Sequence, residues 1–145
     1  MSTHTASSGS LATSTASRPL LALRWLALLS TLSVLCQGIT AGEVLMKNHT
    51  ALEFHAGGAI LLHVLTGLAA IAAGLHWRAS RGSLWPTVLA VIVFVATFVQ
   101  AEFGHGRTLY IHVPLALLIL LGTTWLTAWA WLADRSAART RHAVT

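Results

Sequence analysis

Long apolar stretches separated by short polar segments run through most of the chain. Each of the four longest approaches or exceeds the roughly 20 residues that an α-helix needs to cross a hydrocarbon core about 30 Å thick. These stretches cover residues 20–41, 54–77, 84–101 and 109–133. None shows the period-2 alternation of a membrane barrel strand, and backbone groups in lipid are most simply satisfied within a helix. The pattern therefore predicts an all-α protein, a four-helix transmembrane bundle.

The segments between the predicted spans are short, so consecutive helices are expected to be antiparallel neighbours in an up-down-up-down arrangement. No domain boundary is visible within residues 20–133. Residues 1–19 form a leader rich in Ser and Thr without hydrophobic periodicity, which predicts disorder, and residues 134–145 form a basic tail. The bundle is therefore expected to be the only folded unit.

The start of the chain has a second interpretation. Arg18 and Arg24, followed by an apolar run that ends in the small residue Ala41, also resemble a secretory signal peptide. Retention of the segment is favoured because Ile39 is large for the minus-three position and the apolar run extends back to Leu20. Cleavage would leave three helices.

Composition agrees with a membrane protein and charge orients it. Apolar residues make up 55% of the 145 residues and charged residues 9%, against roughly a quarter charged in soluble domains. Basic residues collect at one set of span ends, where they predict the cytoplasmic side: Arg18, Arg24, Arg78, Arg81, Arg135, Arg139 and Arg141. All six Trp residues lie at the same ends. Both termini are therefore predicted to be cytoplasmic, in a multi-pass protein of a bacterial-type plasma membrane.

The net charge of +5 is explained by this topology signal and by attraction to anionic lipid, so no nucleic-acid partner is expected. The single cysteine, Cys36, excludes an internal disulfide framework and any CxxC motif. Lipid is the expected environment, and a membrane redox partner or a homo-oligomer is compatible with the pattern.

The stretch EFHAGGAILLH places His55 and His63 in a helix that should hold few ionisable residues. A histidine inside a membrane span indicates a functional site by default. His55 and His112 lie about one turn inside the outer ends of the second and fourth spans, so they share a depth. His63 lies roughly 12 Å deeper, rotated by about 80° from His55. Two imidazoles from alternate helices predict the axial ligands of a haem b, with His55 and His112 as the iron ligands and His63 in reserve.

Other interpretations of these polar residues stay open. Interhelical hydrogen bonds compete with haem ligation for His55 and His112, and a hydrogen bond to a carbonyl or Gln competes for His63. Glu53 and Glu102 are most simply interfacial acids, although either could hold a histidine N–H. Gln37 and Gln100 are most simply helix-to-helix hydrogen bonders. Zinc is disfavoured because no familiar third-ligand spacing is present.

These residues carry a family resemblance. Four motifs carry it: QxxxxG in the first span, EFH opening the second, VQAEFG closing the third and IHVPLALLILLG opening the fourth. Together they resemble one four-helix half of the haem A synthase family. Small bacterial four-helix membrane proteins with the same Gln, Gly and His pattern are also similar. The resemblance implies that His55 and His112 lie on the outer side and associate with haem. The chain supplies only one half, so the resemblance does not carry the full enzyme's second haem site or its activity.

The favoured function is a b-type-cytochrome-like protein that passes single electrons near the outer face. The alternative is a structural or accessory membrane subunit without cofactor. A cavity between the second and fourth spans would favour haem, whereas Leu62, Leu115 or Phe103 would fill that space in a packing protein. A proton or metal transporter ranks last, since only His63 approaches the midplane. Whether the chain is an enzyme is left undecided by the sequence.

Overall fold

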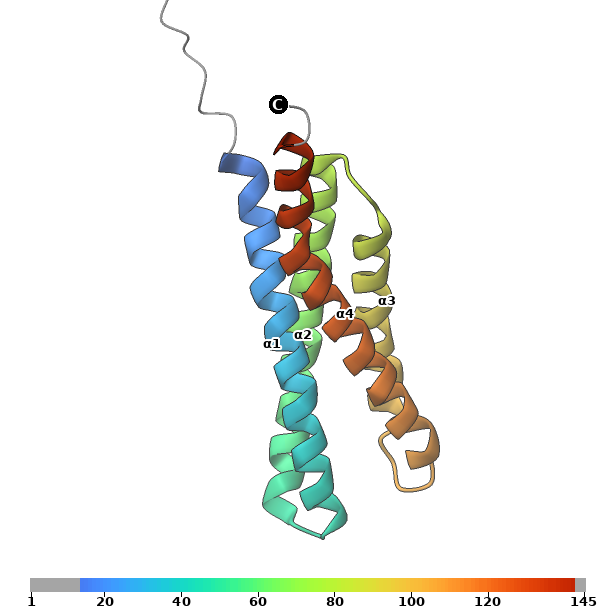
Figure 1. Ribbon diagram of the computed structural model, residues 1–145. Coiled ribbons are helices and arrows are strands. Elements are labelled where there is room, and N and C mark those ends of the chain that lie inside the picture. Colours follow the sequence, from blue (N-terminus) through green and yellow to red (C-terminus); the bar gives the residue numbers. More distant parts are fainter. Residues whose placement is uncertain (1–13, 143–145) are drawn as a thin grey trace, which may run out of the picture.

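The computed structural model describes residues 14–142 of the backbone and the side chains of residues 18–133. Four α-helices account for nearly all of it (Figure 1): α1 (Ser14–Leu45), α2 (His49–Ser80), α3 (Trp85–Glu102) and α4 (Leu109–His142). All four are long and apolar enough to cross a membrane. The prediction of an all-α bundle of four membrane-length helices is therefore confirmed.

The helices extend further than the apolar stretches that predicted them. The first begins at Ser14, so residues 14–19 of the leader expected to be disordered are helical, while residues 1–13 lie outside the described residues. The second begins at His49 because Asn48 caps it, its side chain accepting a hydrogen bond from the Ala51 N–H. The fourth continues to His142, through most of the basic tail. Hydropathy marks the part of a helix that lies in lipid, and these helices continue through their polar ends.

The turns between helices follow from local chemistry. Arg81 adopts a left-handed conformation after α2, and its N–H donates to the Trp77 carbonyl at 2.8 Å. Pro86 stands in the first turn of α3, where its missing N–H costs nothing. Three residues, 46–48, connect α1 to α2.

The helices pack in a closed ring. α1 packs against α2 and α4, and α3 packs against α2 and α4, while no Cα atoms of the diagonal pairs lie within 8 Å of each other in the described part of the chain. At one end of the ring the core is built largely from small residues, including Ala27, Ala69, Ala73, Ala90 and Ala130. Small side chains let membrane helices approach closely, because lipid offers no hydrophobic drive to bring them together.

One glycine contact shows how close this approach is. A Cβ atom on Gly122 of α4 would lie 2.6 Å from Val93 Cγ2 of α3. Val93 belongs to the second core cluster, together with Val34, Leu62 and Ile119. The four helices are thus locked around the middle of the bundle, which fixes the rotation of each helix and so the side chains it presents at either end.

Four buried hydroxyl groups are satisfied within their own helices. Ser30, Thr66, Thr97 and Thr123 are buried, one from each helix, and each hydroxyl donates to a carbonyl three or four residues earlier in its own helix. By contrast, large apolar side chains cover the outside: Leu118, Ile71 and Ile92 are each more than half exposed. An apolar exterior of this kind suits contact with lipid.

Aromatic residues gather at the Ala-rich end of the ring. Trp25 and Trp131 meet edge to face with ring centroids 5.6 Å apart, and the Arg24 guanidinium lies 5.5 Å from the centre of the Trp131 ring. Trp85 and Trp125 make a second edge-to-face pair at 6.3 Å. This end carries both tryptophan pairs, whereas the opposite end holds His55 and His112.

Candidate functional site

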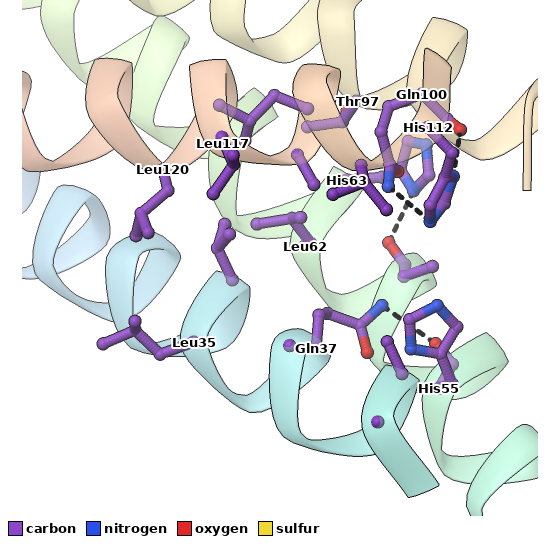
Figure 2. A pocket seen from close by; sticks show the side chains of 18 of the residues that line it. Leu35, Gln37, His55, Leu62, His63, Thr97, Gln100, His112, Leu117 and Leu120 are labelled. Atoms are coloured by element: carbon purple, nitrogen blue, oxygen red, sulfur yellow. Dashed lines mark hydrogen bonds between the residues drawn. The ribbon is translucent and has the colours of Figure 1, made fainter. Parts of the chain in front are cut away.

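A cavity of about 360 Å³ lies in the half of the bundle that carries the histidines. All four helices line it, and Figure 2 shows its polar side chains at one end. Its walls are small at several positions: Gly38, Ala41, Gly42, Ala59 and Ala116. Its inner end is apolar, formed by Val34, Leu62, Ile119 and Leu120. The volume falls within the range of about 300–1,000 Å³ that is typical of ligand pockets.

Two histidines from different helices meet at the polar end of this cavity. His55 lies near the start of α2 and His112 near the start of α4. Their ring centroids are 6.3 Å apart, with an angle of 53° between the rings. Although no Cα atoms of the diagonal helices α2 and α4 lie within 8 Å of each other in the described part of the chain, these two side chains meet between them. The sequence argument that placed both residues at one depth agrees with this proximity.

His55 is held by two residues of α1. Its Nδ1 lies 2.9 Å from the Thr40 hydroxyl. The Gln37 side-chain amide donates to the His55 backbone carbonyl at 2.9 Å. Gln37 and Thr40 are three residues apart on α1, so they lie on one face of that helix and act on one residue of α2.

A glycine makes room for this contact. A Cβ atom on Gly58 would lie 2.6 Å from the Gln37 Oε1, so any larger residue there would displace the Gln37 amide. The neighbouring Gly57 has nothing within 4 Å of the same position. Of the two adjacent glycines in EFHAGG, therefore, the second is the one that the site requires.

His112 is held by one residue of α3 through two bonds. Its Nδ1–H donates to the backbone carbonyl of Gln100 at 2.8 Å, because a carbonyl can only accept. Its Nε2 therefore carries the lone pair, which accepts from the Gln100 side-chain amide at 2.8 Å. The tautomer of His112 is thus fixed by the backbone of the preceding helix, with Nε2 as the nitrogen able to bind a metal.

His63 also lines the cavity but makes different contacts. Its Nδ1 bonds to the Ala59 carbonyl in its own helix, and its ring lies against Phe98, with centroids 4.1 Å apart. Its Nε2 is buried and has no hydrogen-bond partner among the described residues. The sequence hypothesis of a bond from His63 to a carbonyl is therefore correct for Nδ1.

The acidic residues Glu53 and Glu102 lie at the histidine end of the bundle but do not join the site. Glu53 and Glu102 are exposed, and the Nδ1 atoms of His55 and His112 are hydrogen-bonded instead to Thr40 and to the Gln100 backbone. Within residues 18–133, no three His, Cys, Asp or Glu side chains come together as a metal-binding group. The site thus offers two histidine side chains and no acidic ligand among the described residues.

Thr40 is the site residue that sequence reasoning missed. Gln37 and Gln100 were correctly interpreted as residues that hydrogen-bond between helices, but without histidine as their target. The only sequence signal for Thr40 is its position three residues after Gln37, which places both on the α1 face that meets α2. Thr is common in membrane helices, so this spacing would not have distinguished it.

Comparison with known proteins gives no further information about the function of this site. No family model, no curated protein and no solved structure matches the chain.

Proposed function

We propose that the chain is an integral membrane, b-type-cytochrome-like protein that holds a haem b between His55 and His112. The observation that carries the proposal is the pair of anchored imidazoles, with ring centroids 6.3 Å apart, at the polar end of a cavity whose inner end is apolar. Two imidazole–metal bonds of about 2 Å each, added to the distance from each nitrogen to its own ring centre, require a centroid separation of roughly 6 Å. The measured separation suits one metal ion between the two rings.

The donor set favours haem over a bare metal ion. Structural metal sites in proteins use about four protein ligands, whereas two histidines meet here. A porphyrin supplies the remaining four nitrogens itself. It also needs apolar walls and room beside the metal. From His112 to Leu120, both of which line the cavity, α4 rises by about 12 Å.

The chain's own residues would hold the cofactor as follows. The backbone carbonyl of Gln100 keeps the His112 Nδ1–H, so the Nε2 lone pair would hold the group once the Gln100 side-chain amide had left that nitrogen. The small wall residues leave space for a planar ring. When bound, a haem with histidine on both axial sides supplies one-electron chemistry without an open site for oxygen. The proposed role is therefore electron transfer near the outer face, with a membrane redox partner.

We also propose that the bundle runs up-down-up-down with both termini cytoplasmic. Basic residues and tryptophans at the end opposite His55 and His112 support this orientation. With Cys36→Ser as background, Lys47→Cys is expected to react with a membrane-impermeant maleimide on intact cells, and Gly82→Cys only after lysis. Labelling of Gly82→Cys alone on intact cells would reverse the orientation.

An optical spectrum tests the haem proposal directly. We expect protein expressed with ample haem and purified in detergent to show sharp α and β bands after dithionite reduction, as a six-coordinate haem does. A featureless visible spectrum at full haem supply would overturn the proposal. The histidines would then be assigned to helix packing in an accessory membrane subunit.

A further inference from the structure

We propose that Thr40 is the positioning residue that selects which nitrogen of His55 faces the cavity and, through it, the redox potential of the bound iron. The inference rests on the proposed haem function and deepens it. Thr40 does not line the cavity. It acts from behind His55, on the ring nitrogen that a ligand in the cavity would not touch.

The hydroxyl of Thr40 has one proton, which it can donate in a hydrogen bond to a backbone carbonyl of α1. Its Oγ1 lies 3.1 Å from the Gln37 carbonyl and 3.2 Å from the Cys36 carbonyl. Both are backbone acceptors that a threonine in an apolar helix commonly uses. With that proton engaged, the hydroxyl oxygen offers only lone pairs to His55, 2.9 Å away. The Nδ1 of His55 must then be the donor.

The opposite assignment, with the Thr40 hydroxyl donating to His55 Nδ1, makes fewer hydrogen bonds. If the hydroxyl donated to Nδ1, the proton of the imidazole would move to Nε2, where no hydrogen bond joins His55 to another described residue. That assignment makes one hydrogen bond, whereas donation from the Nδ1–H to the hydroxyl, with the hydroxyl donating to a carbonyl of its own helix, makes two. An N–H on Nδ1 has the hydroxyl as its acceptor and leaves Nε2 as a bare lone pair. A lone pair at that position is what iron binds.

In both histidines the Nδ1–H is therefore the hydrogen-bond donor, but the two acceptors differ in kind. On α4, the Nδ1–H of His112 is held by the Gln100 backbone carbonyl, which no substitution can remove. On α2, the Nδ1–H of His55 is held by a side chain. Because a partner on the distant nitrogen sets the orientation and basicity of a ligating histidine, Thr40 is the position where sequence can tune the iron.

Thr40→Val and Thr40→Ser make a matched pair. Valine keeps the branched shape and removes the acceptor, while serine keeps the hydroxyl. We expect the haem dissociation constant of Thr40→Val to rise about 10–100-fold, the usual effect of losing such a partner. Thr40→Ser should stay within a few-fold of the wild type. Since the lost bond stabilises ferric iron more than ferrous iron, the midpoint potential of Thr40→Val should rise, by about 59 mV for each tenfold difference between the two affinities.

A second measurement needs no haem. In ¹⁵N-histidine-labelled haem-free protein, the His55 signal, identified by its loss in His55→Ala, should show the Nδ1–H tautomer in the wild type and in Thr40→Ser. It should change in Thr40→Val. Circular dichroism and gel filtration establish that each variant keeps the folded bundle.

The outcomes separate the two proposals. If the wild type binds haem and Thr40→Val matches it in affinity, potential and tautomer, the role of Thr40 is overturned and the haem function stands. If the wild type binds no haem at any supply, the haem function falls and the role of Thr40 toward iron falls with it. A changed tautomer with a shifted potential supports both.

Discussion

Replacing both His55 and His112 by alanine is expected to abolish the haem absorbance of the purified protein. The two rings are the only pair of imidazoles that meets at the cavity within the described residues, and without them the iron has no axial ligand from the bundle. Each single replacement should leave a five-coordinate or weakly bound haem with broadened, shifted bands. The measurement is the dithionite-reduced spectrum together with haem content per protein.

Two histidine replacements elsewhere serve as controls for this result. His105→Ala removes an exposed histidine of the loop between α3 and α4 and should leave the spectrum unchanged. His63→Ala removes the reserve ligand and should leave the six-coordinate bands in place. If the double variant instead keeps the full spectrum, His55 and His112 are not the ligands. His63, whose Nε2 is buried without a partner in the described structure, would then be the first residue to test.

Hydropathy predicted the helices because lipid imposes one rule on all of them. Every backbone group in the hydrocarbon core must bond within its own segment, so an apolar run of sufficient length becomes a helix whatever its neighbours are. The ends were less predictable because they obey other rules. Residues 49–53 were expected to precede the second helix, yet Asn48 caps the helix and these residues form its beginning. At the start, α1 continues back to Ser14 through residues that hydropathy does not mark.

For the candidate site, the sequence could predict only the depth of each histidine along its helix. Depth follows from counting residues along a helix, and the count placed His55 and His112 together. The partners of each ring depend on how neighbouring helices are rotated about their axes. That rotation is set by contacts far from the histidines, such as Gly122 against Val93. Thr40 meets His55 for this reason, and no local spacing encodes it.

The cavity itself depends on the same packing. Sequence reasoning named Leu62, Leu115 and Phe103 as the side chains that would fill the space in a cofactor-free bundle. Leu62 is buried in the wall, beside Val34 and Ile119, and the space remains because the positions facing it are Gly38, Ala41 and Ala116. Small residues in a membrane helix have two interpretations, close helix contact or room for a ligand. The same residue types serve the first at the tryptophan end and line the cavity at the histidine end.

Ala116→Phe is expected to prevent haem binding while both ligands stay in place. Ala116 lies one turn after His112 on α4 and lines the cavity directly inside the pair of rings. A phenyl ring there would occupy the space beside the metal that the porphyrin plane needs. Because the side chain would enter an existing void, the helices need not separate, and the bundle should remain folded. We expect haem content per protein near zero, with circular dichroism and gel filtration matching the wild type.

Leu118→Phe is the matched control, since Leu118 lies two residues away on the same helix, is 62% exposed and faces outward. That variant should bind haem as the wild type does, because it adds the same ring on the lipid-facing side. Loss of haem in both variants would indicate a general failure of α4 to pack. Full haem content in Ala116→Phe would place the cofactor outside this cavity, even if His55 and His112 were still required. Loss of haem in Ala116→Phe alone would show that binding needs the space in this cavity as well as the two histidines. No histidine variant can test that requirement.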